Sequence, residues 1–154
     1  MKRKTVLLCM VLVLVGLIST AKYISSRRAA STSADQPIHL ASIYASFKQS
    51  KKPSVIVFSY DAECCETTKA FFQDYNSKAK AFLEKQKNKL NTLFVNTGTM
   101  NEQQVSEFLE IAQETSMTEV PCVLLLDSSG KPVEIISGPF DAAAVSKAAE
   151  GLVR

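Results

Sequence analysis

The sequence predicts an α/β fold, in which a mixed four-stranded sheet is flanked by helices and follows an N-terminal hydrophobic helix. Two observations predict the sheet. From Pro37 onward, the apolar residues alternate between helical spacing and short continuous runs that contain β-branched residues. A Ser-Ser-Gly turn at 128–130 separates the last two of these runs. The hydrophobic helix is predicted by residues 6–18, which include no polar side chain.

Residues 1–24 are predicted to be a membrane anchor or a signal peptide. Three basic residues at positions 2–4 precede the apolar run, which is the pattern of an export signal. The basic residues Lys22, Arg27 and Arg28 beyond the run favour an uncleaved anchor, whereas the small residues at 19–21 suit a cleaved signal peptide. Both interpretations put the rest of the chain outside the cytoplasm, either membrane-anchored in a periplasmic or extracellular space, or secreted.

Composition separates the N-terminal segment from the rest of the chain. Residues 25–36 are small and polar, and they are predicted to link the anchor to a domain at 37–154. Residues 1–35 have a net charge of +5, whereas residues 36–154 have a net charge of −2. Because the domain has no basic stripe, nucleic acid is excluded as a partner. We expect the domain to be a monomer.

The first half of the domain is predicted to form a helix, a strand and a second helix. Helical spacing relates Leu40, Ile43, Tyr44 and Phe47. This first helix must end before Pro53. The continuous apolar run at 55–58 predicts a strand that is covered on both faces. After the adjacent cysteines at 64 and 65, a second helical stripe comprises Phe71, Phe72, Tyr75, Ala79, Phe82 and Leu83.

The second half is predicted to contain three strands and two helices. The strands are expected at 90–95, 123–126 and 133–136. A helix at 105–112 has Asn101 as its expected cap, and Asp141 is expected to cap the last helix. The early strands, which helices connect, must run parallel, and the tight turn makes the last pair antiparallel.

The order of these elements resembles the thioredoxin superfamily over residues 37–154. Three stretches carry the resemblance. The first is the strand end Phe58-Ser59-Tyr60-Asp61-Ala62-Glu63-Cys64 before a long helix. The second is T-S-M-T-E-V-P-C-V-L-L-L-D, which is similar to the segment that holds the family's cis-proline, here Pro121. The third is S-S-G-K-P-V-E-I-I-S-G-P-F, which is similar to the final hairpin of the family.

The sequence departs from this family at its redox motif. The family has C-x-x-C, with the first cysteine exposed at the helix N-terminus and the second one turn further on. Cys64 matches the first position, and Thr67 occupies the second. Glu63 replaces the usual aromatic residue, and Phe58 occupies the place of a buried carboxylate. The resemblance therefore does not imply the family's standard dithiol mechanism for this chain.

Three cysteines are the candidate catalytic residues: Cys64, Cys65 and Cys122. The N-terminal end of a helix favours a thiolate, so we expect Cys64 to be moderately activated against the opposing charges of Glu63 and Glu66. The resemblance implies that Cys122 approaches the pair if Pro121 is cis. All three pairings into a disulfide remain open, and a strained Cys64–Cys65 bond would suit a switch.

The favoured function is thiol–disulfide exchange outside the cytoplasm with a client protein or a small thiol or disulfide. Cys64 would attack, Cys65 or Cys122 would resolve, and Val120 with Pro121 would bind an extended client. No cofactor or resident metal is expected, since zinc needs four Cys or His ligands. Two alternatives are a protein that binds soft metals such as Cu(I) or Hg(II) through its thiolates, and a redox-inactive interaction domain. The single histidine, His39, is expected on the surface.

Overall fold

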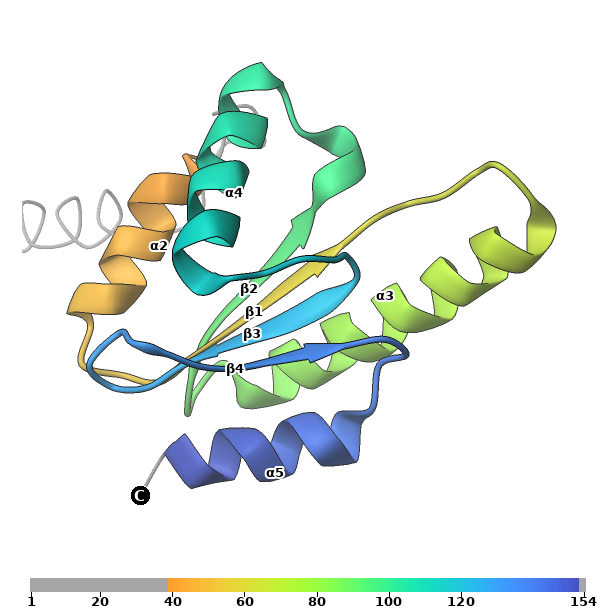
Figure 1. Ribbon diagram of the computed structural model, residues 1–154. Coiled ribbons are helices and arrows are strands. Elements are labelled where there is room, and N and C mark those ends of the chain that lie inside the picture. Colours follow the sequence, from red (N-terminus) through yellow and green to blue (C-terminus); the bar gives the residue numbers. More distant parts are fainter. Residues whose placement is uncertain (1–38, 153–154) are drawn as a thin grey trace, which may run out of the picture. The chain divides into compact units, whose positions relative to one another are not determined.

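The structure, a computed structural model, describes residues 39–152 (Figure 1). The predicted anchor at 1–24 and linker at 25–36 lie outside the described residues. The elements of the domain, in chain order, are α2 (Leu40–Gln49), β1 (Ser54–Ser59), α3 (Glu66–Gln86), β2 (Asn91–Asn96), the short 3₁₀ helix η1 (Thr97–Thr99), α4 (Glu102–Thr115), β3 (Cys122–Leu126), β4 (Pro132–Ser137) and α5 (Ala142–Leu152). Within 39–152, no helix has both the length and the apolar character needed to cross a membrane.

The four strands form one mixed sheet in the order β2-β1-β3-β4. Strand β1 pairs in parallel with β2, and β3 pairs antiparallel with both β1 and β4. The predicted mixed four-stranded sheet is confirmed. The parallel rule holds for β1 and β2 only, because the connection through α4 brings β3 to the other side of β1 in the opposite direction.

Helices cover both faces of the sheet, as predicted from its two fully buried strands (Figure 1). Side chains alternate between the faces along β1 and β3, since successive residues of a strand point to opposite sides. One face packs on α3 and α5 through Val55, Val57, Val123 and Leu125. The other packs on α2 and α4 through Ile56, Phe58, Cys122, Leu124 and Leu126.

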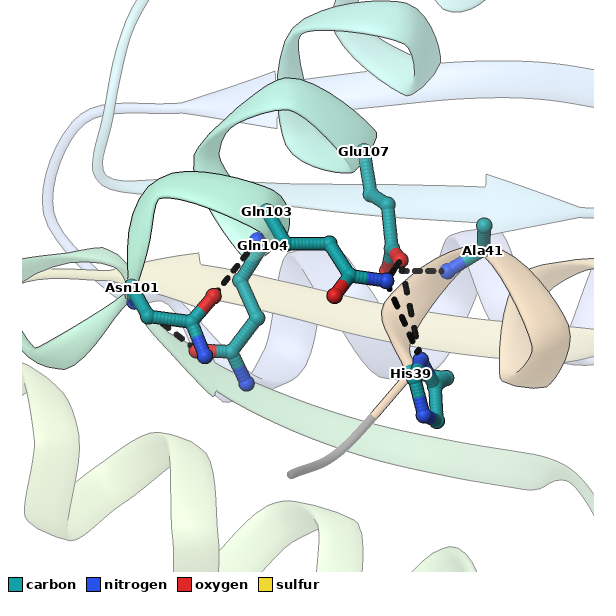
Figure 2. Close-up of polar contacts among 6 residues, drawn as sticks. All are labelled: His39, Ala41, Asn101, Gln103, Gln104 and Glu107. Carbon is teal, nitrogen blue, oxygen red and sulfur yellow. Dashed lines mark hydrogen bonds and ion pairs between the residues drawn. The ribbon is translucent and has the colours of Figure 1, made fainter.

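Polar contacts fix the start of α4 and its position beside α2 (Figure 2). Asn101 caps α4, because its side chain accepts a hydrogen bond from the backbone of Gln104 and the Gln104 side chain accepts one in return. Glu107 accepts a hydrogen bond of 3.0 Å from the backbone N–H of Ala41 in the first turn of α2. Asp141 likewise accepts from two backbone N–H groups of α5. Both caps that were predicted from the sequence are confirmed.

The turn before β4 leaves no room for a side chain at Gly130. Its φ is +79°, and a Cβ atom there would lie 2.4 Å from the Cα atom of Lys48 at the end of α2. Gly138 also has a positive φ, +90°, but nothing lies within 4 Å of a Cβ atom there. A side chain at Gly138 would therefore introduce backbone strain alone, whereas a side chain at Gly130 would introduce backbone strain and a steric overlap.

We expect Gly138→Ala to lower the free energy of unfolding by about 1–2 kcal/mol, which is the cost of the left-handed conformation alone. Gly130→Ala should cost about 3 kcal/mol or more, because the overlap with α2 is added to the same strain. Urea unfolding of the two variants checks this difference. Equal losses would contradict a close contact between this turn and α2.

Candidate functional site

The adjacent cysteines lie at the N-terminal end of α3. The helix begins at Glu66, and Cys65 is its N-cap residue, with an extended backbone at φ −161°. The Sγ atom of Cys65 lies 3.0 Å from the Oγ1 atom of Thr68, one turn into the helix. Cys64 and Cys65 are both exposed and free. The chain therefore presents two thiols to solvent at the positive end of a long helix.

The surroundings of Cys65 stabilise its thiolate. The hydrogen bond with the Thr68 hydroxyl lowers the pKa of Cys65 most, and the backbone N–H of Thr68 comes next. The Cys64 thiol and the backbone N–H of Thr67 lower this pKa further. Hydrogen bonds to the charged form favour that form. A larger share of Cys65 is therefore ionised near neutral pH than of an ordinary cysteine.

The structure places the N-terminal end of α3 one residue later than the sequence interpretation did. The sequence interpretation put Cys64 at the helix N-terminus and Thr67 one turn on, but the cap position belongs to Cys65. With Cys65 at the cap, Thr68 is the residue one turn into the helix. The physical reason is that α3 begins with Glu66 in its first turn, where a carboxylate is favourable to the helix.

Phe58 and Ser59, the last two residues of β1, point to opposite faces of the sheet. Six residues before Cys65 stands Ser59, and the alternation along β1 puts Ser59 on the face that α3 covers. Phe58 is fully buried on the opposite face, against Phe108 of α4. The hydroxyl of Ser59 is fully buried and donates a hydrogen bond of 2.5 Å to Asn76 of α3. A neutral polar pair, not an apolar ring, therefore lies at the end of β1 under the helix.

Asn76 is a site residue that the sequence interpretation did not identify. Its Nδ2 atom donates to the Oδ1 atom of Asp61 at 2.7 Å, and Asn96 at the end of β2 donates to the Oδ2 atom at 2.5 Å. Asn76 is buried, at 6% exposed. The sequence feature that could have identified Asn76 is its position next to Tyr75, within the apolar stripe of α3. This network ties the segment between β1 and the cysteines to two neighbouring elements.

A hollow of about 180 Å³ lies beside the cysteines. Its lining residues come from the segment before Cys64 and from the first turns of α3: Asp61, Ala62, Glu63, Lys69, Phe72 and Gln73. The exposed ring of Tyr60 packs edge-on against Phe72, with ring centroids 5.8 Å apart. The hollow therefore combines an aromatic wall with side chains of both charges.

Cys122 does not join the exposed pair. Its side chain is fully buried in the cluster between the sheet and the helices α2 and α4, and its thiol lies 3.0 Å from the sulfur of Met117. Burial, together with the charge of Glu119, raises the pKa of Cys122 to about 12. Cys122 is free, as are Cys64 and Cys65. The expected approach of Cys122 to the pair is not observed, because the first residue of β3 points into the core.

Val120, Pro121 and His39 are the remaining residues singled out from the sequence. The Val120–Pro121 peptide bond is cis, and both residues are half-buried just before β3. Client binding by these two residues stays a prediction. The His39 side chain is 56% exposed, and its Nδ1 atom lies 3.8 Å from Glu107 (Figure 2). Among residues 39–152, no group of three or more Cys, His, Asp or Glu side chains is arranged to hold a metal.

Comparisons with known proteins give similarity to solved structures only. No protein-family model matches the chain, and no curated protein matches it. Thioredoxin O2 of Arabidopsis thaliana is 17% identical, with 73% of this chain and 85% of that chain covered and a TM-score of 0.48. The exposed lipoprotein thioredoxin of Streptococcus pneumoniae is 15% identical, with 71% and 90% covered and a TM-score of 0.49. A DsbH oxidoreductase is 22% identical, with 82% and 97% covered and a TM-score of 0.47.

These likenesses concern the fold. The domain has a thioredoxin-like fold, which its own strand order, strand directions and helices on both faces define. The fold that the resemblance implied is therefore confirmed by the domain's own topology. What the site does has to be argued from its own residues.

Replacing Thr68 tests the source of the Cys65 activation. In Thr68→Val the hydroxyl partner is lost, so the pKa of Cys65 should rise and its alkylation at pH 7 should slow severalfold. The pH profile of iodoacetamide labelling at Cys65, followed by mass spectrometry, measures both effects. Thr67→Val is the matched control, because Thr67 acts through its backbone N–H, which valine retains. A similar shift in both variants would contradict the role of the hydroxyl.

Burial should protect Cys122 from the same reagent. With a pKa of about 12, only about one Cys122 in ten thousand is a thiolate at pH 8. We expect Cys64 and Cys65 to be labelled under native conditions while Cys122 is labelled only after unfolding in urea. Labelling of Cys122 at the rate of Cys65 in the folded protein would show that the core around Met117 is open.

Proposed function

We propose that this protein is a thiol–disulfide oxidoreductase in which Cys65 is the attacking thiol. The observation that carries the proposal is the placement of Cys65: exposed, at the N-cap of α3 and in contact with Thr68, with a lowered pKa. Thiol–disulfide exchange requires a thiolate that can reach a sulfur atom of the partner. Cys65 has both properties, and the fold is one that carries this chemistry in similar proteins.

The reaction proceeds in two exchanges. The Cys65 thiolate attacks one sulfur of the client disulfide, a Cys65–client bond forms as the client bond breaks, and the second client sulfur leaves as a thiolate. The Cys64 thiolate then attacks Cys65 Sγ and displaces the remaining client sulfur. The client gains two electrons, and the Cys64–Cys65 pair loses two as it forms a vicinal disulfide. An external thiol reductant returns the pair to its starting state.

Cys64 suits the resolving step better than Cys122. Cys64 is the exposed neighbour of Cys65 and helps to lower its pKa, whereas the Cys122 thiol is enclosed in the core. Thr68 holds the place of the second cysteine of the family and cannot form a disulfide. The roles proposed from the sequence are therefore exchanged: Cys65 attacks and Cys64 resolves. Of the soft-metal alternatives, a site of three thiolates has less support, since only two of the described cysteines are exposed, and a site of two thiolates would consist of Cys64 and Cys65.

The cellular setting proposed from the sequence is retained. The basic residues and apolar run of 1–24 suit a membrane anchor, and the polar stretch 25–36 suits a tether to the domain. We place the reaction outside the cytoplasm, on the disulfides of client proteins or small molecules. Val120 would offer its backbone to an extended client segment beside the thiol.

Replacing Cys65 and replacing Cys64 should impair the reaction at different steps. Cys65→Ser should abolish reduction of a protein disulfide such as that of insulin, because no attacking thiolate remains. Cys64→Ser should still attack but should accumulate a mixed disulfide at Cys65, which non-reducing electrophoresis and mass spectrometry detect. If Cys65→Ser reduces the disulfide as fast as the parent, the proposal is wrong. If Cys64→Ser turns over without the accumulated adduct, the resolving role of Cys64 is wrong.

A further inference from the structure

Negative charge surrounds the cysteine pair. Asp61, Glu63 and Glu66 are exposed within four residues of Cys65, and Lys69 is the one cation of the segment 61–69. The ion pairs that glutamates form in residues 39–152 involve Glu84, Glu107 and Glu114. Glu63 and Glu66 therefore have no cation partner in the described part of the chain. Their charges are available to a molecule that approaches Cys65.

Part of this negative charge lies at the hollow beside the cysteine pair. Asp61 and Glu63 line it together with Lys69 and the half-buried ring of Phe72, and Tyr60 extends the aromatic wall. The network through Asn76 and Asn96 holds the Asp61 carboxylate in place, with both oxygens engaged. A volume of about 180 Å³ suits a single long side chain. Carboxylates and aromatic faces both attract a cation.

We propose that the site selects client disulfides whose cysteine is flanked by Lys or Arg in an extended peptide segment. The inference rests on the proposed exchange at Cys65 and names its substrate class. The basic side chain enters the hollow against Asp61, Glu63 and Phe72, and its stem lies along the aromatic wall. A client with acidic flanks is repelled by the same carboxylates. Lys69 moderates the preference without reversing it, because the acidic residues outnumber it.

The test compares three short peptides as symmetrical disulfides, which differ only in the residues flanking their cysteine: Lys, Gln or Glu. Full-length Cys64→Ser protein traps the adduct at Cys65, so its rate of formation reports the first exchange. At low ionic strength we expect the Lys peptide to react about tenfold faster than the Glu peptide. The ratio should fall toward one in 0.5 M salt, because exposed charges are screened.

Charge variants show whether these residues cause the selectivity. Glu63→Gln with Glu66→Gln should reduce the Lys-to-Glu rate ratio to about threefold or less, and Lys69→Met should increase it. Any change in the Cys65 thiolate affects all three peptides alike and cancels in the ratio. Glu102→Gln with Glu110→Gln, on α4, is the matched control with the same change in net charge, and it should leave the ratio intact.

The Gln peptide separates this inference from the proposed function. If the Gln peptide reacts and the Lys and Glu peptides react at the same rate, exchange at Cys65 stands and the charge selection is overturned. If the control on α4 lowers the ratio as much as the Glu63 and Glu66 pair, the effect belongs to net charge and the assigned site is overturned. If the Gln peptide forms no adduct at Cys65, the proposed function fails and the selection fails with it.

Discussion

The structure depends on strand β1 being buried on both faces and paired on both edges. All six of its residues are buried, and it lies between a parallel partner and an antiparallel one. A strand in this position has no side open to water, so helices must cover both faces of the sheet. Beyond its carboxyl end, at Tyr60 and Asp61, the chain is exposed again. The cysteine pair lies directly beyond that end, on a segment whose starting point the core holds fixed.

The site obtains its chemical character from short-range contacts. Cys65 is stabilised as a thiolate by the Thr68 hydroxyl and by backbone N–H groups of the first helical turn. The polar group under the helix is the neutral Ser59–Asn76 pair, which accepts no proton in the pH range where thiols react. An arrangement of this kind activates one thiol without a buried base. This arrangement suits a site whose second thiol belongs to Cys64, the exposed residue directly before Cys65.

Much of the fold could be predicted from the sequence because burial patterns act over several residues at once. The four strands and the helices on both faces follow from such patterns, and the caps Asn101 and Asp141 follow from their residue type just before a helix. The start of α3 could not be placed as well, since moving a helix end by one residue alters little in the apolar pattern. That single residue decides whether Cys64 or Cys65 is the cap. The orientation of Cys122 likewise depends on the register of β3, which is a property of strand pairing.

The attachment of α2 to α4 has a mechanical consequence for a domain whose chain enters at α2. Glu107 holds the first turn of α2 through the Ala41 backbone, and Glu114 contacts Tyr44 in the middle of α2 and Lys48 in its last turn. A pulling force on the chain ahead of Leu40 meets these two attachments before it reaches β1. The cysteine pair lies beyond β1, on the helix that covers the opposite face. The contacts that hold α2 therefore run to α4 on one face of the sheet, whereas the thiols lie at the end of a helix on the other face.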